Sequence, residues 1–168
     1  MKTDSVDKLL AQWRKERPEL DVSGLSLPIR IEMLAKLLRS STANSLSKVG
    51  LKTWQYDVLS ALRRQGLPYE LPATELARSS LLTSGAMTTR IDQLESLHLV
   101  HREPDPDDRR GVLVRLTPQG AAVVDKAIEA RLSAAETSIE GLNARERSAI
   151  ESGLRKLLLS LSPIRDSG

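Results

Sequence analysis

Aromatic residues are scarce in this sequence of 168 residues, which contains two Trp, two Tyr and no Phe. Domains that bind single-stranded nucleic acid stack the bases on aromatic side chains exposed on a sheet. The sequence cannot supply such a platform, so we exclude this class of function. The apolar share is nevertheless 40%, and 29 of the residues are leucine. We therefore predict a core of aliphatic side chains carried by helices, in one domain with or without a helical extension.

Cysteine is absent altogether, which excludes disulfides, thiolate zinc sites and thiol redox chemistry. Long hydrophobic runs are missing as well, because no stretch of 18 apolar residues occurs and the first 20 residues are charged throughout. We therefore expect a cytoplasmic protein that is neither exported nor inserted into a membrane.

Enzyme motifs are also missing. The sequence has no phosphate-binding loop, no nucleophile elbow and no HExxH helix. Its two histidines, His98 and His101, lack a third metal ligand. Asp105, Asp107 and Asp108 lack the glycine and the distal glutamate of a calcium loop. We expect a protein that is not an enzyme and that uses neither a metal nor another cofactor.

Positive charge exceeds negative charge by three units, and the excess is concentrated in residues 31–66. In that segment six basic residues stand against two acidic ones: Lys36, Arg39, Lys48, Lys52, Arg63 and Arg64 against Glu32 and Asp57. Such a surplus permits binding to nucleic acid without requiring it.

Apolar residues at intervals of three and four predict four helices, over residues 6–16, 27–48, 54–64 and 73–79. Thr53 is the expected N-cap of the third helix, and Pro72 introduces the fourth. Thr83 or Ser84 is expected to cap a further helix that ends near Leu97. The last two of these helices, joined by a tight turn, match the helix-turn-helix pattern.

The hydrophobic period changes after residue 97. Residues 99–103 and 111–116 read as strands, the second with clear alternation of apolar and polar positions. The polar segment 104–110 between them contains two prolines and is expected to project into solvent as a loop. A β-hairpin attached to a helix-turn-helix is a winged helix.

Two long helices are predicted after the hairpin. Thr117 caps the first, which continues to about Ile139, and a capping box at residues 143–146 opens the second. The fold class is therefore mainly α with a small β-hairpin wing. We divide the chain into an extra N-terminal helix and linker (1–24), a dimerisation helix (25–50), a winged helix-turn-helix DNA-binding domain (51–117) and C-terminal dimerisation helices (118–168).

The helices outside the winged segment, over residues 27–48 and 118–162, carry more apolar face than one winged helix can cover. Large exposed apolar patches are rare on monomers, so we expect these faces to bury each other across a two-fold axis in a homodimer. Winged-helix proteins that recognise palindromic sites also need two DNA-binding domains, one for each half-site. The alternative is one larger helical domain that is monomeric.

A helix that enters the major groove needs short polar side chains near its N-terminus, where backbone N–H groups also meet phosphate. The helix that begins after residue 83 offers such side chains at Thr83, Ser84, Gly85, Ala86, Thr88 and Thr89. Arg90 follows them and is long enough to reach a phosphate or a guanine edge. The alternative is that this segment is only a helix start rich in small residues.

Arg109 and Arg110 occupy the tip of the predicted hairpin. From there a long cationic side chain can enter a narrow minor groove, where the negative potential is enhanced. Asp107 and Asp108 would each repel phosphate, so we assign to Asp108 the role of orienting a wing arginine through a bidentate pair. The alternative is a solvated loop of mixed charge that takes no part in binding.

The segments that contain these residues resemble a known family. Residues 108–117, DRRGVLVRLT, look like the wing signature of the MarR family of bacterial transcription regulators, and residues 89–95, TRIDQLE, resemble the end of its recognition helix. The likeness extends from about residue 27 to residue 162. It implies a homodimeric repressor that binds a pseudo-palindromic operator in double-stranded DNA, in the bacterial cytoplasm and at the nucleoid. His98 stands where the family usually has glycine.

Residues 10–21, LAQWRKERPELD, are similar to the extra first helix of the urate-responsive PecS and HucR branch of that family. In that branch a tryptophan of the extra helix, an aspartate of the second core helix, an arginine of the recognition helix and an arginine of the first wing strand form an effector pocket. The matching residues here are Trp13, Asp57, Arg90 and Arg102. The resemblance implies a small anionic effector such as urate, which releases the protein from DNA.

These residue types suit a flat anionic oxopurine, which needs an aromatic or apolar wall and a guanidinium to pair with its charge. Asp57 would repel the anion. If Asp57 also holds an arginine of the recognition helix, binding of the ligand shifts that helix and weakens DNA binding.

Two alternatives stay open at this point. In the first, Trp13 only packs the N-terminal helix onto the core, and Asp57 and Arg90 form an ordinary ion pair. In the second, the protein is a winged-helix DNA-binding protein without a small-molecule effector.

Overall fold

The computed structural model describes residues 3–106, 108 and 111–161. The helices in this part of the chain are α1 (Ser5–Glu16), α2 (Ser26–Ser47), α3 (Thr53–Arg63), α4 (Ala73–Ser79), α5 (Ser84–Ser96), α6 (Pro118–Ile139) and α7 (Ala144–Leu161), and the strands are β1 (Glu70–Pro72), β2 (Val100–Pro104) and β3 (Val112–Leu116). The predicted fold class, mainly α with a small β wing, is confirmed. None of the described helices is both long enough and apolar enough to cross a membrane.

The three strands form an antiparallel sheet in the order β1-β3-β2. The predicted hairpin is the β2–β3 pair, in which Arg102 lies opposite Val114. β1 adds a third strand by pairing with β3, so that Glu70 lies opposite Arg115. β1 escapes prediction from sequence because three residues that end in proline show no alternation, and only the pairing with β3 defines them as a strand.

One aliphatic core joins the end of α2, helices α3 to α5, the sheet and the first half of α6. Its largest fully buried side chains are Leu46, Val58, Leu59, Leu62, Leu76, Met87, Ile91, Leu94, Val100, Val114 and Val124. Helix α5 contributes Met87, Ile91 and Leu94, which are spaced by four and three residues and therefore share one face. That face is fixed to the core, and the opposite face of α5 is left to solvent.

Helix α5, the sheet and α6 meet at a tight junction. The Thr117 hydroxyl donates to the carbonyl of His98 (2.7 Å) and accepts from the N–H of Gly120 (2.9 Å), as expected of the N-cap of α6. A Cβ atom at Gly120 would lie 1.9 Å from the carbonyl oxygen of Leu99, so only glycine permits this approach. His98 has a φ of 56°, the left-handed conformation that glycine adopts most easily, and histidine keeps the same turn here.

Two further predicted caps are confirmed. The Thr83 hydroxyl accepts from the backbone of α5 at 3.3 Å, and the ends of the 143–146 segment exchange side-chain-to-backbone hydrogen bonds of 2.9 and 3.0 Å. The prediction for Thr53 is wrong, because Thr53 is the first residue of α3 and Lys52 is its N-cap. The N–H of Lys52 donates to the side-chain oxygen of Gln55 at 2.8 Å, so the end of this helix is satisfied without a hydroxyl.

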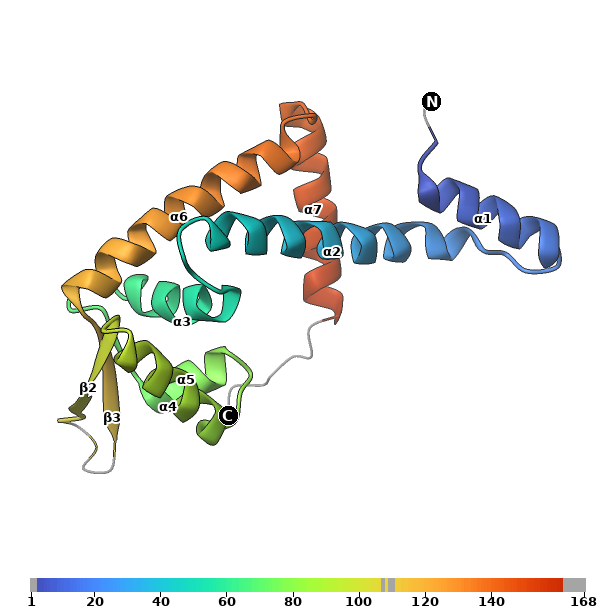
Figure 1. The fold of residues 1–168 in the computed structure, drawn as a ribbon. Helices are drawn as coiled ribbons and strands as arrows, with labels where there is room; N and C mark the ends of the chain where they lie inside the picture. The colour runs from blue at the N-terminus through green and yellow to red at the C-terminus, as the bar shows by residue number, and fades with distance from the viewer. Residues whose placement is uncertain (1–2, 107, 109–110, 162–168) are drawn as a thin grey trace.

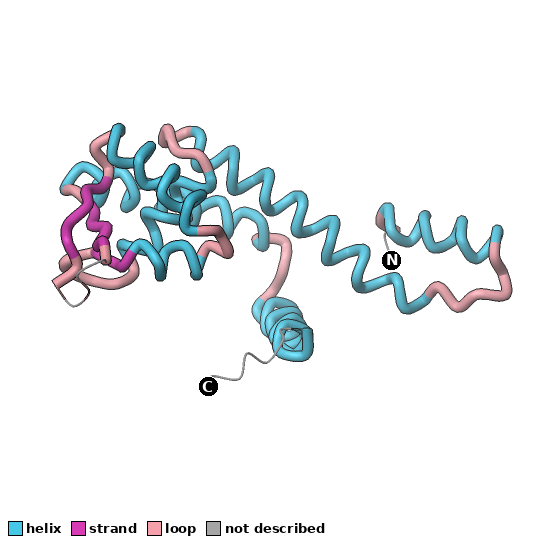
Figure 2. Tube along the Cα trace, turned by 90° about the horizontal axis from the view of Figure 1, so that it is seen from below, coloured by secondary structure: helices cyan, strands magenta, loops and turns pink. Residues whose placement is uncertain are grey.

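Figures 1 and 2 show that α2 extends well beyond the winged helix-turn-helix, that α1 packs against its outer end and that α7 stands apart. No described residue of α7 is buried. Large apolar side chains are exposed on three helices: Leu27, Leu34, Leu37 and Leu38 of α2, Leu132 and Ile139 of α6, and Ile150, Leu154, Leu158, Leu159 and Leu161 of α7. These are the helices for which the sequence predicts uncovered apolar faces, and the rest of the described chain leaves them open.

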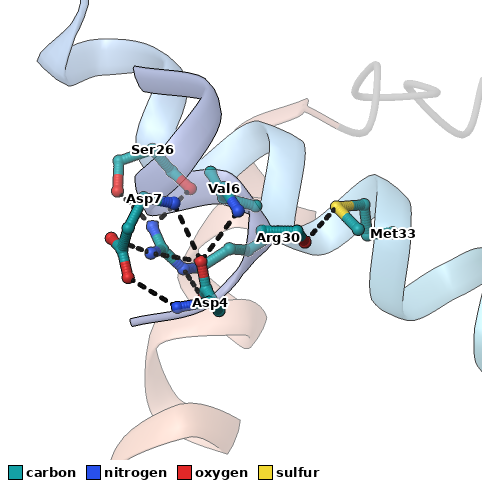
Figure 3. A network of polar contacts seen from close by, with 7 residues as sticks. Asp4, Val6, Asp7, Ser26, Arg30 and Met33 are labelled. Carbon is teal, nitrogen blue, oxygen red and sulfur yellow. Dashed lines mark hydrogen bonds and ion pairs between the residues drawn. The ribbon is translucent and has the colours of Figure 1, made fainter. Parts of the chain in front are cut away.

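A polar network fastens the start of α1 to α2 (Figure 3). The Asp4 carboxylate accepts from the N–H groups of Val6 (2.8 Å) and Asp7 (2.9 Å), and the Asp7 carboxylate accepts from the N–H of Asp4 (3.0 Å), which completes a capping box. Arg30 of α2 pairs with Asp4 at 2.9 Å and with Asp7 at 2.6 Å. The hydrogen bonds from the backbone of Asp7 and from Arg30 lower the pKa of Asp4 below its ordinary value.

Replacing Asp4 tests whether charge or capping holds α1. Asp4→Asn keeps an acceptor for the helix N–H groups but loses the charge that pairs with Arg30, whereas Asp4→Ala loses both. We expect amide hydrogen exchange in residues 5–16 to be faster in Asp4→Asn than in the wild type and fastest in Asp4→Ala, with α3 unchanged. Because the folded-state pKa of Asp4 is lowered, wild-type α1 should keep its protection at neutral pH and lose it as the pH falls through that pKa. Wild-type exchange rates in Asp4→Asn would mean that capping alone holds the helix.

Candidate DNA-binding surface and effector pocket

The first turns of α5 form an open, polar surface. The residues assigned to the major groove, Thr83, Ser84, Gly85, Ala86, Thr88 and Thr89, are all exposed. The Thr88 and Thr89 hydroxyls donate to the carbonyls of Ser84 (3.0 Å) and Gly85 (3.2 Å). A Cβ atom at Gly85 would meet nothing within 4 Å. The backbone at the start of α5 is therefore free to approach a large ligand closely, and its terminal N–H groups favour an anion.

Arg90, which the sequence assigns both to DNA and to an effector, points back toward α3. Its guanidinium lies 5.4 Å from the centre of the Trp54 ring, a cation–π distance. Arg90 is half-buried and lines a cavity together with Asp57 of α3. This placement favours the effector role over a contact with a base edge.

The wing is described only in part. Arg109 and Arg110, the predicted minor-groove residues, lie outside the described residues, as does Asp107. Asp108 is exposed, and its carbonyl accepts from the N–H of Gly111 at 2.8 Å. A Cβ atom at Gly111 would lie 2.8 Å from that of Asp105, so glycine is required where the chain turns back into β3.

Arg102, the fourth predicted effector residue, ties the wing to α5. Its guanidinium forms ion pairs with Asp92 and Glu95 of α5, both at 2.5 Å, and donates to the carbonyl of Thr88 at 3.3 Å. Its own N–H also donates to the Glu95 carboxylate at 3.1 Å. These acceptors occupy the guanidinium, so Arg102 acts in this structure as a link between β2 and α5.

Asp57 lines two neighbouring cavities. The larger, of about 730 Å³, lies between α2, α3 and α6, and the smaller, of about 380 Å³, lies between α3, the α4–α5 turn and Arg90. Tyr56 and Asp57 line both. Partial burial raises the pKa of Asp57, and the positive charges of Arg90, Arg131 and Arg64 oppose that rise.

The structure thus brings together two of the four predicted effector residues, Asp57 and Arg90. Trp13 lies elsewhere: α1 packs at the outer end of α2, away from α3 (Figures 1 and 2), and 48% of the Trp13 side chain is exposed. Arg102 belongs to the link between the wing and α5. Sequence reasoning did not select Tyr56, which lines both cavities.

The simpler reading of these residues also fails to match the structure. α1 is packed by Val6 and Leu10, which are buried against Val22, rather than by Trp13. The Asp57 carboxylate has no ion pair within 4.0 Å with Arg90, although the two charges interact electrostatically. More than 4.0 Å therefore separates the carboxylate from the guanidinium, and both residues line the smaller cavity.

The histidines are placed as a turn residue and a wing residue. His98 forms the turn after α5, and the His101 side chain lies 2.9 Å from Glu103 on the same strand. Within the described residues no group of three or more His, Asp or Glu side chains is arranged to hold a metal ion.

The model of the MarR family matches residues 49–111, from the start of the helix-turn-helix to the wing. The HTH-type transcriptional regulator PecS of Dickeya dadantii is 31% identical over 124 residues, which is 74% of this chain and 75% of that protein. The chain belongs to the MarR family. Its relatives are transcriptional regulators, and this MarR protein is a regulator rather than an enzyme.

Solved structures of MarR proteins share the fold. A C80S mutant of MarR from Escherichia coli, complexed with operator DNA, aligns with a TM-score of 0.68 at 27% identity and covers 87% of this chain and 97% of that one. Sco3205 from Streptomyces coelicolor, also in complex with DNA, gives a TM-score of 0.74 at 23% identity and covers 88% of this chain and 96% of that one. The second likeness is one of fold alone.

The link made by Arg102 can be tested by Arg102→Gln. We expect operator affinity to fall about tenfold, because β2 and α5 are no longer held at a fixed angle, while the free energy of unfolding falls by less than about 1 kcal/mol. Fluorescence anisotropy with labelled operator and thermal melting measure the two effects. The control Arg17→Gln removes an exposed ion pair with Glu19, far from the wing. Unchanged DNA affinity with an altered effector response would instead assign Arg102 to the effector.

Proposed function

We propose that this MarR protein is a homodimeric repressor that binds a pseudo-palindromic operator and is released by a small anionic aromatic effector such as urate. The observation that carries the proposal is the position of Arg90. This residue belongs to α5, the helix offered to DNA, and it also lines the cavity that contains Asp57. A ligand in this cavity therefore touches the DNA-reading helix directly.

The case for DNA rests on the surface of α5 and on the wing. The exposed small and polar side chains at residues 83–89 suit the major groove, and the N-terminus of α5 suits a phosphate. Arg109 and Arg110 remain the proposed minor-groove contacts, with Asp108 as the residue that orients them. Such a regulator would act on the bacterial nucleoid, in the cytoplasm.

The case for a homodimer rests on the uncovered apolar faces of α2, α6 and α7. A second copy is the partner that covers all of these faces at once with identical ones. It also bears on the effector pocket. Because α1 lies away from α3 within one chain, a pocket that contains both Trp13 and Asp57 requires Trp13 of the second copy.

Release from DNA follows from charge. An anion that enters the gap between Asp57 and Arg90 pairs with the guanidinium and repels the carboxylate. Arg90 then moves relative to α3 and takes α5 with it, which changes the spacing and tilt of the two reading helices in the dimer. A change of this kind lowers operator affinity through a movable element that both sites share.

The alternative is a winged-helix regulator without an effector, in which α1 only extends the interface between two copies. The presence of Asp57 and Arg90 in the lining of one cavity favours the effector. A flat thermal-shift response to purines and aromatic acids, together with DNA binding that no such ligand alters, would favour the alternative.

A gel-shift titration tests the proposal. We expect the dimer to prefer a pseudo-palindromic duplex with half-sites about 10 bp apart over random DNA, with affinity that falls steeply as salt rises. Arg109→Ala and Arg110→Ala should weaken binding, while Arg145→Ala, an exposed arginine at the start of α7, should not. Urate should release the wild-type protein, and Trp13→Phe should bind DNA normally but respond differently to urate.

Two results of this titration are decisive. If no duplex is preferred over random DNA, the DNA-binding proposal fails. If Trp13→Phe and the wild type are released at the same urate concentration, Trp13 does not belong to the pocket.

A further inference from the structure

The two cavities at Asp57 carry more positive charge than the four residues of the resemblance account for. Arg39 and Arg131 line the larger cavity, and Arg64 and Arg90 line the smaller one. Among the described residues, Asp57 is the one acidic residue in either lining. Four positive charges and one negative charge leave a formal surplus of three positive charges around these two neighbouring cavities.

Like charges that line neighbouring cavities repel each other, and solvent screens this repulsion least at Arg90 and Arg131, which are half-buried, whereas Arg39 and Arg64 are exposed. One anionic group on a ligand offsets only part of it. The surplus is also divided, with one pair of arginines on each side of Asp57.

These guanidinium groups retain donors for a ligand. Among the described residues, Arg39 and Arg131 form neither an ion pair nor a hydrogen bond, whereas Arg64 only donates to the Ser60 hydroxyl at 3.3 Å. Arg90 lies over the Trp54 ring. Arg102 differs from all of them, because Asp92, Glu95 and Thr88 already occupy its donors. The capacity to bind an anion is therefore greatest on the two sides of Asp57.

We propose that the effector carries two anionic groups on one aromatic body. One group pairs with Arg39 and Arg131 between α2, α3 and α6, and the other pairs with Arg64 and Arg90 between α3 and α5. Tyr56, which lines both cavities, lies beside the aromatic body. This inference rests on the proposed effector-controlled function and narrows the class of its ligand from aromatic anions to aromatic dianions.

The position of the two arginine pairs explains what a second anionic group on the ligand would do. Arg39 and Arg131 belong to α2 and α6, helices with the uncovered apolar faces, whereas Arg90 belongs to the DNA-reading helix. A dianion joins these two parts of the protein through one rigid molecule. A monoanion such as urate can satisfy one pair and leaves the other unneutralised, so it should bind more weakly than a dianion of similar size.

The test is isothermal titration of the full-length protein with benzoate and with terephthalate, which share one ring and differ by one carboxylate. Ionic strength is held constant, because salt screens the difference between the two ligands. We expect terephthalate to bind at least about tenfold more tightly than benzoate. In Arg131→Gln this preference should shrink to less than about threefold, mainly through weaker binding of terephthalate.

Two further variants serve as a replicate and as a control for Arg131→Gln. Arg39→Gln removes the other cation of the same pair and should act like Arg131→Gln, which keeps the test valid if one variant folds poorly. Arg155→Gln removes one charge from the exposed helix α7 and should leave both affinities unchanged. Equal affinities for the two ligands in the wild type, or a preference for terephthalate that survives both pocket variants, overturns the proposal.

The outcome is distinguishable from that of the proposed function. If terephthalate is preferred but neither it nor urate releases operator DNA, the dianion site stands and effector-controlled repression fails. If urate releases DNA and terephthalate has no advantage, repression stands and the dianion site fails.

Discussion

The contact between Gly120 and the carbonyl of Leu99 is the constraint on which the DNA-binding part of the molecule depends. It brings the first turn of α6 against the first residue after the α5 turn, and Thr117 adds hydrogen bonds to both sides of the same junction. The end of α5, the start of the wing and the start of α6 are therefore one rigid body. A displacement of α5 cannot be absorbed at its C-terminal end, so it is transmitted to the wing and to α6.

Helix α5 is held on three sides and free on a fourth. Met87, Ile91 and Leu94 fix one face to the core, and the ion pairs with Arg102 fix a second. The junction fixes the C-terminal end. On the side of α3, however, Arg90 and Asp57 attract each other across a gap without an ion pair. An effector acts most easily at that side, because no ion pair between Arg90 and Asp57 has to break before the ligand enters, and the contact that Arg90 makes there is with the Trp54 ring.

Neighbouring residues in the sequence determine much of this fold, but they do not determine the effector pocket. Helix starts at Thr83, Thr117 and Asn143, and the hairpin of the wing, are set by neighbouring residues, so caps and alternation predict them. β1 and the true cap of α3 depend on partners that the local pattern does not reveal, namely strand β3 and the side chain of Gln55.

The pocket depends on contacts between elements distant in the sequence. Family resemblance supplied Asp57 and Arg90, which the structure brings to one cavity. It also supplied Arg102, which the structure shows paired with α5. Arg131 lies on a helix whose pattern predicts only an apolar face, and its place beside Asp57 arises from the packing of α6 on α2 and α3. The basic segment 31–66 includes Arg39 and Arg64. Its composition does not indicate that they lie near Arg131, which is 67 positions beyond Arg64.

The energetics of release constrain how this site works. A ligand shifts the protein toward the state that does not bind DNA only by the difference between its affinities for the two states. Coupling between sites is typically about 1–3 kcal/mol, a change of roughly 5- to 150-fold in affinity. Contacts with α2 and α3 alone hold the ligand equally well in both states and contribute nothing to release. The contact with Arg90 changes directly when α5 moves, and the contact with Arg131 changes only as far as that movement reaches along α6. Arg39 therefore contributes to how tightly an effector binds, whereas Arg90 sets most of the extent to which that binding lowers the affinity for DNA.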